Sequence, residues 1–273
     1  MLLRRSASPF MFIAGMACAG TFAHAGSTLF RVDDLDLRDP HVFINFISCM
    51  DATDSGFPGF SVNGSLQDRI QGDTDPADGY LDLSYVLEFR PLDQSAGINA
   101  MTFGNAQCTA PRATSACAPI SNPVDTTATL SAATECLAPL PDTLHPYTPN
   151  VTAAPAPCFS SSPATFEFVL AGTPVVLHDM QLAATFDNAP ATGLLSGVIR
   201  GFLTEEDANN TVIPASYPVI GGQKFSSLLA GGTGACPMFS DKDLNASTPG
   251  WWFYFNFVAN AVASDVIFAD AFE

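Results

Sequence analysis

The residues whose types and spacing are most typical of a functional site lie in an aspartate-rich segment that begins at Asp73 and ends at Asp82. Asp75 and Asp78 lie between these two acids, and Gly79 provides for a sharp turn. Calcium binds about six to eight oxygen ligands at about 2.3–2.6 Å, and alternating carboxylates with a backbone carbonyl supply such ligands from a short loop. The segment therefore predicts a calcium site. A solvated acidic turn is the alternative, because Asp and Gly are favoured in turns for other reasons.

The order of these residues resembles the acidic loop of EF-hand-like calcium sites. The resemblance implies side-chain ligands from Asp73, Asp75 and Asp78, the carbonyl of Tyr80, and Asp82 directly or through water. The segment has one residue more between its second and third acids than that loop has, and it leads into a predicted strand instead of a second helix. We therefore expect a calcium loop between β elements and not a complete EF-hand.

A second, shorter acidic segment runs from Asp241 to Asn245. Asp241 and Asp243 alternate with other residues, as calcium loops require, but Lys242 lies between them and no glycine follows. This segment is a weaker candidate for a metal site. The alternative interpretation is a surface loop.

Patterns for nucleophilic catalysis are missing from the sequence. It has no Gly-x-Ser-x-Gly motif, and His41, His145 and His178 are scattered along the chain. Each of these histidines is more typical of a packed or surface residue than of a general base. Glycoside hydrolysis needs only two carboxylates brought together in space, so the sequence leaves a hydrolase open.

Aromatic residues near the C-terminus offer a possible binding surface. In the strand expected over residues 251–258, Trp252 and Tyr254 lie on the face opposite to Trp251 and Phe253. Two rings on one face of a strand can stack against a sugar, so Trp252 and Tyr254 are a candidate ligand platform. The alternative is that a loop or a second layer packs over them.

The N-terminus is typical of a secretory signal peptide. Arg4 and Arg5 precede an apolar stretch over residues 10–22, and Ala23-His24-Ala25 forms a small-x-small cleavage site. The apolar stretch is shorter than the roughly 20 residues of a membrane-spanning helix, so we expect cleavage after Ala25 and no transmembrane segment after it. A lipoprotein modified at Cys18 is the alternative, although the expected leucine does not precede that residue.

The charge of the chain limits its partners. The formal net charge is −17, and it becomes −19 once Arg4 and Arg5 leave with the signal. Nucleic acids and anionic membrane surfaces both require clustered Lys and Arg, so we expect neither as a partner. The hydrophobic content of 47% instead indicates a folded protein, and the negative net charge favours cations as binding partners.

Six cysteines remain after the signal, and an even number in an exported chain predicts disulfides. They are Cys49, Cys108, Cys117, Cys136, Cys158 and Cys236. Six cysteines allow 15 connectivities, and the sequence does not choose among them. We favour the short loops Cys108–Cys117 and Cys136–Cys158, which leaves Cys49 to pair with Cys236.

The periodicity of the chain is that of β-strands. Apolar and polar residues alternate over 29–37, 42–47, 81–89, 165–170, 175–186, 194–202 and 251–258. Helical patterns are short: Thr204 precedes three acids as an N-cap would, and residues 223–229 fit one or two turns. Residues 111–163 are rich in Pro, Ala, Thr and Ser and hold three cysteines, which predicts an irregular insert stapled by disulfides.

These patterns favour an all-β antiparallel β-sandwich, because the long helices that parallel sheets require are absent. We expect one domain over residues 26–263 that includes the insert, followed by a tail over 264–273. The tail resembles a short ending, Phe-x-Asp-Gly-Phe-Glu, of uncharacterised secreted proteobacterial proteins, with Ala271 in place of the glycine. That resemblance implies a bacterial exported protein.

The expected function is that of a secreted, periplasmic or cell-surface binding module, stabilised by disulfides and calcium, whose ligand is a carbohydrate or a protein. A secreted hydrolase of polysaccharide or ester, and a structural envelope protein, are the alternatives. The sequence favours a protein without catalytic activity over an enzyme but does not decide between them.

Overall fold

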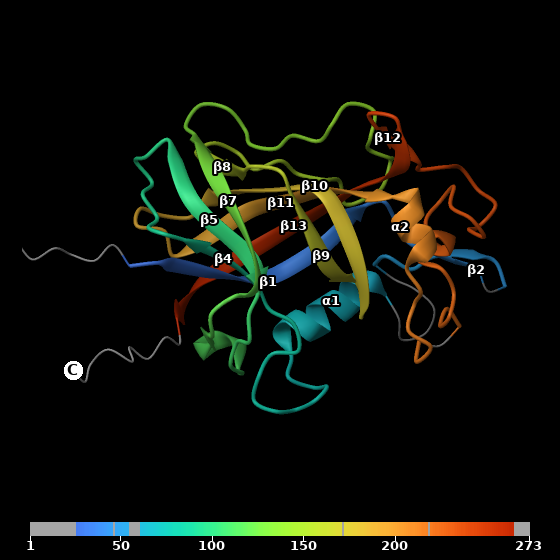
Figure 1. Cartoon of the computed structure of the whole chain (residues 1–273), viewed down its shortest axis with the longest axis horizontal. Helices are drawn as coiled ribbons and strands as arrows, with labels where there is room; N and C mark the ends of the chain where they lie inside the picture. Colours follow the sequence, from blue (N-terminus) through green and yellow to red (C-terminus); the bar gives the residue numbers. More distant parts are fainter. Residues whose placement is uncertain (1–25, 46, 55–60, 171, 218, 265–273) are drawn as a thin grey trace, which may run out of the picture.

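The first and last long strands of the chain pair with each other and close a barrel (Figure 1). β1 (Thr28–Asp39) and β13 (Thr248–Ser264) are antiparallel, and Leu29 lies opposite Val262. The structure is a computed structural model that describes residues 26–45, 47–54, 61–170, 172–217 and 219–264.

Six further strands complete the barrel. They are β4 (Tyr85–Phe89), β5 (Ile98–Asn105), β7 (Ser121–Ser131), β8 (Cys158–Ser161), β10 (Thr173–Phe186) and β11 (Gly193–Thr204). The order around the barrel is β1-β4-β5-β7-β8-β10-β11-β13, and every neighbouring pair is antiparallel. The predicted sandwich is therefore wrong. Sandwiches and barrels both bury one face of each strand, so the period of two does not distinguish them.

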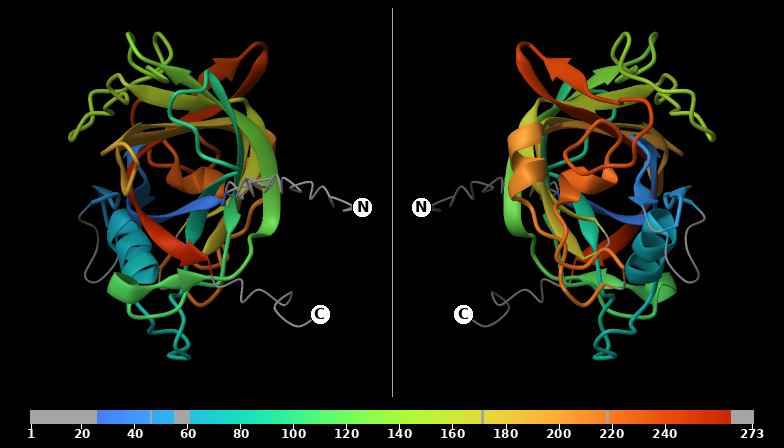
Figure 2. Two further views of the ribbon diagram at one scale, coloured as in Figure 1. Left: turned by 90° about the vertical axis from the view of Figure 1, so that its left-hand side faces the viewer. Right: turned by 90° about the vertical axis from the view of Figure 1, so that its right-hand side faces the viewer.

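Short elements cover one end of the barrel (Figures 1 and 2). They are β2 (Phe43–Asn45), β3 (Cys49–Asp51), α2 (Glu205–Asn210) and η2 (Phe225–Leu228), while β12 (Asp243–Asn245) pairs with β13 at the rim. The expected N-cap is confirmed, because the Thr204 side chain accepts a hydrogen bond from the backbone N–H of Asp207. A single turn of 3-10 helix forms within residues 223–229.

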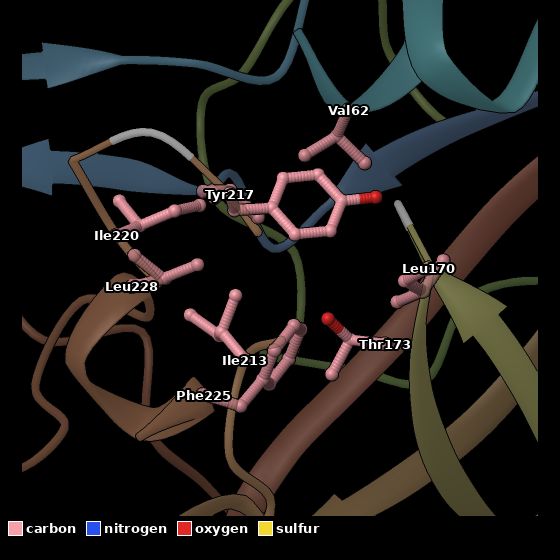
Figure 3. Close-up of a pocket in the computed structure, with 9 residues that line it drawn as sticks. Val62, Leu170, Thr173, Ile213, Tyr217, Ile220, Phe225 and Leu228 are labelled. Atoms are coloured by element: carbon pink, nitrogen blue, oxygen red, sulfur yellow. The ribbon is translucent and has the colours of Figure 1, made fainter. Parts of the chain in front are cut away.

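A small apolar cavity lies beneath these covering elements (Figure 3). Leu170, Ile213 and Phe225 are among its walls, and Thr173 and Tyr217 contribute hydroxyl-bearing side chains. The centre of a water molecule can occupy only about 20 Å³ of this space, which is enough for about one water. The cavity is therefore a packing gap, and we assign no ligand to it.

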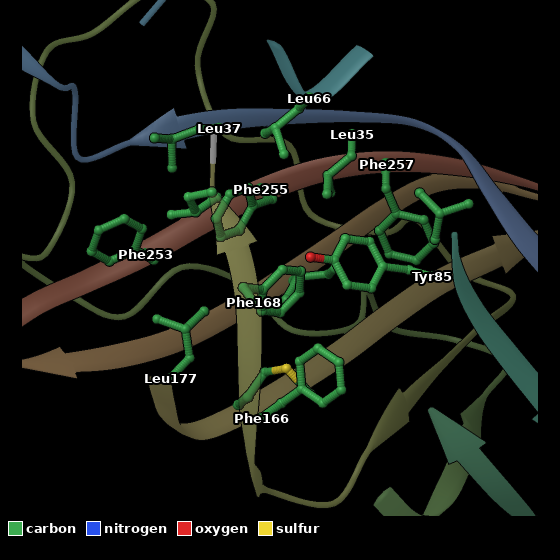
Figure 4. Packing of buried hydrophobic residues seen from close by; sticks show 14 of the residues in the cluster. Leu35, Leu37, Leu66, Tyr85, Phe166, Phe168, Leu177, Phe253, Phe255 and Phe257 are labelled. Atoms are coloured by element: carbon green, nitrogen blue, oxygen red, sulfur yellow. The ribbon is translucent and has the colours of Figure 1, made fainter. Parts of the chain in front are cut away.

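Aromatic rings fill the barrel interior (Figure 4). β9 (Ala164–Leu170) folds back along β10 and turns Phe166 and Phe168 into the core. Phe168 stacks on Phe255 with ring centroids 5.5 Å apart, and its neighbour Val169 donates a backbone hydrogen bond of 2.8 Å to the hydroxyl of Tyr85. An eight-stranded barrel either is filled by side chains or holds one small ligand. This one is filled.

A helix that the sequence analysis missed packs against β1. α1 (Val62–Gln71) begins at Ser61, whose hydroxyl accepts a hydrogen bond of 3.0 Å from Gly64 N. Leu66 and Ile70, four residues apart, are buried against the barrel. Val62, Asn63 and Gly64 are poor helix formers, so tertiary contacts and the cap stabilise this helix against its local propensity.

The insert is less irregular than expected. β7 lies inside it and runs along the barrel, while η1 (Arg112–Thr114) and β6 (Ala116–Cys117) are short. Only Val124 and Leu130 are large among the inward positions of β7, and Ala128 fills the space between them. The alternation is therefore too weakly hydrophobic to predict a strand. Residues 132–157 contain no strand or helix, as expected.

Three disulfides confirm the expected connectivity. Cys108 pairs with Cys117, Cys136 with Cys158, and Cys49 with Cys236. Three disulfides indicate an oxidising location outside the cytoplasm. None of the helices within the described ranges is long and apolar enough to cross a membrane. The expected signal peptide over residues 1–25 and the tail from residue 265 lie outside the described residues.

Candidate functional site

Two carboxylates organise the acidic loop that precedes β4. Asp73 accepts hydrogen bonds of 2.9 Å from the backbone N–H groups of Asp78 and Gly79. Asp82 accepts from the backbone N–H of Thr74 at 3.0 Å, from the Thr74 hydroxyl at 2.8 Å, and from Asp75 N. These bonds lower the pKa of Asp82 although its partial burial acts in the opposite direction, so Asp82 is ionised at neutral pH.

The loop forms one wall of a surface groove, which we call the acidic groove. Asp75, Asp78, Tyr80 and Asp82 line it from the loop side, and Asn105 at the end of β5 lines the opposite side. The centre of a water molecule can occupy about 340 Å³ of the groove. None of the residues that line it is Lys, Arg or His. The groove is therefore negative and has space for more than a single ion.

Two polar atoms at the acidic groove are buried and have no hydrogen-bond partner. They are the hydroxyl of Ser84, a residue that is 3% exposed, and the side-chain oxygen Oδ1 of Asn105. A buried polar atom without a partner costs roughly 1–3 kcal/mol, so such atoms are rare in folded proteins. Both residues belong to the lining of the groove, and neither oxygen has a partner within the protein.

The acidic groove contains most but not all of the predicted calcium ligands. It brings Asp75, Asp78, Tyr80 and Asp82 together, whereas Asp73 is occupied by the backbone of its own loop. Within the described residues, no group of three or more His, Cys, Asp or Glu side chains is arranged to hold a metal ion. Calcium binding at this loop stays a prediction that only a titration can test.

A second cluster of ionisable groups lies at the covered end of the barrel. His145, from the insert, has Nδ1 at 3.3 Å from Oδ1 of Asp39 and Nε2 at 3.4 Å from Oδ1 of Asp241. The Tyr147 hydroxyl donates a short hydrogen bond to Asp241, and the Tyr147 ring stacks on His41 with centroids 3.8 Å apart. Segments more than ninety residues apart in sequence therefore meet here.

Burial dominates the electrostatics of this cluster. It raises the pKa of Asp241 to about 6, although Tyr147 and His145 oppose the shift, and it also raises the pKa of Asp243 to about 6. The hydrogen bond to Asp39 raises the pKa of His145, which burial alone would lower. The cluster therefore exchanges protons in mildly acidic to neutral solution.

The cluster binds protons but is not built like a nucleophilic centre. Nδ1 of His41 lies 2.5 Å from Asp51, and both ring nitrogens of His145 face carboxylates. Within the described ranges, no Ser, Thr or Cys side chain hydrogen-bonds to either ring. His178 contacts Asp207 separately, with Nε2 at 2.8 Å. A catalytic triad needs a nucleophile on the second histidine nitrogen, which these pairs lack.

The acids of the segment from Asp241 to Asn245, which the sequence suggested as a surface loop or a weaker metal site, are engaged within the protein. Asp241 is 1% exposed, and Asp243 accepts a 3.0 Å hydrogen bond from the backbone N–H of Trp252. Lys242 donates to Glu205 at 2.6 Å. The acids of this segment therefore serve the protein's own contacts. Their partners are distant in sequence, and no spacing pattern reveals them.

The expected ligand platform is covered. Trp252 is 6% exposed and Tyr254 is fully buried, and residues of the insert pack over both rings. The hydroxyl of Tyr254 contacts Thr143 at 2.5 Å and accepts a 3.1 Å bond from Leu140 N. The two rings are therefore unavailable to a sugar, because they anchor the insert to β13.

No protein-family model, curated protein or solved structure is detectably similar to this chain.

Proposed function

We propose that the protein is an exported binding protein whose ligand is positively charged, with calcium as the simplest such ligand. The observation that supports this function is the acidic groove, where Asp75, Asp78 and Asp82 gather without any basic residue in the lining. Secretion with cleavage after Ala25, to the periplasm, the medium or the cell surface, is part of the proposal. The disulfides support it.

Thermal unfolding with and without calcium tests the proposal. A ligand that binds only the folded state stabilises it by about 2.7 kcal/mol at a hundredfold excess over its Kd. For a protein of this size that corresponds to a rise in Tm of about 5–10 °C. We expect such a rise with calcium at constant ionic strength and its reversal by EDTA. An unchanged Tm in both conditions would remove calcium from the proposal.

Two matched variants make the test specific to the acidic groove. Asp75→Asn with Asp78→Asn removes two carboxylates that line the groove and should abolish the calcium effect. Glu135→Gln with Asp142→Asn removes the same charge from exposed positions outside the groove and should preserve it. Equal losses in both variants would mean that calcium only screens the negative charge of the protein.

The hydrolase alternative lacks, among the described residues, a pair of carboxyls placed at the acidic groove for catalysis. A general acid that works at neutral pH needs a raised pKa, whereas the pKa of Asp82 at the groove is lowered. The pKa values of Asp241 and Asp243 are raised to about 6, but both carboxyls accept hydrogen bonds from the protein itself. A structural envelope protein would need no ligand. It becomes the better interpretation if no cation binds.

A further inference from the structure

The lining of the acidic groove is more specific than a negative patch. Its side-chain groups include ionised carboxylates, which only accept hydrogen bonds, and the unpartnered Oδ1 of Asn105. The hydroxyl of Ser84, a residue that is only 3% exposed, also lacks a partner. These acceptors favour a ligand that donates several hydrogen bonds from one positively charged group.

Apolar residues contribute part of the lining. Leu81 and Leu83 alternate with Asp82 and Ser84, so that one short stretch presents both apolar and polar groups to the groove. Tyr80 is 38% exposed, and its ring is available to a cation. A metal ion gains nothing from contact with apolar side chains, whereas a ligand with a hydrocarbon stem can pack against them.

The loop is already folded around its own backbone, which weighs against a compact metal site. Calcium requires about six to eight oxygens at about 2.3–2.6 Å, but Asp73 and Asp82 accept hydrogen bonds from backbone N–H groups. Asp75 makes no side-chain hydrogen bond or ion pair within the described residues, so its carboxylate is free to accept from a ligand. An ammonium group needs only a few acceptors at hydrogen-bond distance.

We propose that the acidic groove binds a small organic cation that carries a primary ammonium group on a hydrocarbon stem. The ammonium group lies among Asp75, Asp78 and the unpartnered oxygens of Ser84 and Asn105, and the stem lies against Leu81 and Leu83. This inference rests on the proposed function, because it names the class of cation that the groove takes.

Isothermal titration calorimetry with 1,4-diaminobutane tests this proposal on the purified protein with its disulfides intact. We expect saturable binding of the diamine and none of 1,4-butanediol, which has the same stem and no charge. Asp75→Asn with Asp78→Asn should weaken binding at least about tenfold, because charge-assisted hydrogen bonds are lost. Glu135→Gln with Asp142→Asn should bind as the wild type does.

Ser84→Ala separates binding from folding. Removal of a buried hydroxyl without a partner should leave Tm unchanged or raise it, whereas affinity for the diamine should fall by about fivefold or more. An unchanged affinity in this variant would exclude the hydroxyl from the site.

Each outcome bears on one of the two proposals. If calcium binds and the diamine does not, the proposed function stands and this inference is overturned. The inference is also overturned if the two double variants lose diamine affinity equally, because the attraction is then that of net charge alone. If neither cation binds, both proposals fail.

Discussion

Asp241 is buried and His145 is partly buried, and their pKa values determine how stability depends on pH. The pKa of Asp241 is about 6 in the folded protein against an ordinary 3.8, so the unfolded chain loses this proton first as pH rises. The stability associated with Asp241 therefore falls between these two values. The raised pKa of His145 likewise makes the free energy of unfolding fall as pH rises. Its contribution is complete below pH 6.5 and is lost as pH rises through the folded pKa.

The pKa of Asp243 is also raised to about 6, so this carboxyl adds to the same dependence. We expect the free energy of unfolding to fall by on the order of 2–3 kcal/mol between about pH 5 and about pH 8, with similar contributions from Asp241 and Asp243. Asp51, whose lowered pKa matters only in stronger acid, does not contribute to this range. Urea denaturation at the two pH values measures the fall, and Asp241→Asn should remove about half of it. Glu135→Gln, at an exposed position, should behave as the wild type. A pH dependence that is the same in Asp241→Asn would contradict the assignment.

Local sequence shows a site only where its residues are close together in the chain. The acidic loop was predictable because four carboxylates fall within ten residues. Asn105 was not, because β5 brings it to the groove through strand pairing. The cluster around Asp241 combines residues from β1, the insert and the segment before β12. Single-sequence spacing carries no information about such long-range contacts.

At the scale of elements, the disulfides differ in the lengths of chain that they close. The Cys49–Cys236 bond spans 187 residues and ties β3 to the segment that leads to Asp241, whereas Cys108–Cys117 spans 9 residues. A cross-link stabilises a protein mainly by restricting its unfolded chain, and this effect grows with loop length. The long-range disulfide should therefore add more to the free energy of unfolding than the short-range one does.

We expect Cys49→Ser with Cys236→Ser to lower the free energy of unfolding by up to about 5 kcal/mol, and Cys108→Ser with Cys117→Ser by up to about 3 kcal/mol. Urea denaturation of the two double variants gives the comparison. Each variant serves as the control for the other, because both lose one disulfide. A larger loss in the short-loop variant would show that native packing around Cys108, and not chain entropy, determines the order.

The strands that the sequence predicted are those in which large apolar residues alternate with polar ones. β10, β11 and β13 were found in this way. β7 was missed because small residues occupy its inner positions, and α1 because its first turn contains Gly64. In both elements, tertiary contacts overcome weak local propensity. Such contacts are visible only in the folded molecule.

For the whole molecule, the pairing of β1 with β13 closes the sheet into a barrel. A closed barrel leaves no edge along these strands, whereas an open sheet exposes a row of backbone N–H groups. The register runs from Leu29 opposite Val262 to Asp39 opposite Tyr254, with two irregularities, so nearly the whole of β1 has a partner. The topology therefore has a direct consequence for backbone protection.

We expect the amides of β1 and β13 to be among the slowest to exchange with deuterium, because opening them requires the barrel to open. Hydrogen–deuterium exchange with mass spectrometry measures this directly. β12, a three-residue strand at the rim whose one partner among the described strands is β13, is the internal control and should exchange at least about tenfold faster. Exchange in β1 as fast as in β12 would contradict closure, because it would mean that β1 is an unprotected edge of an open sheet.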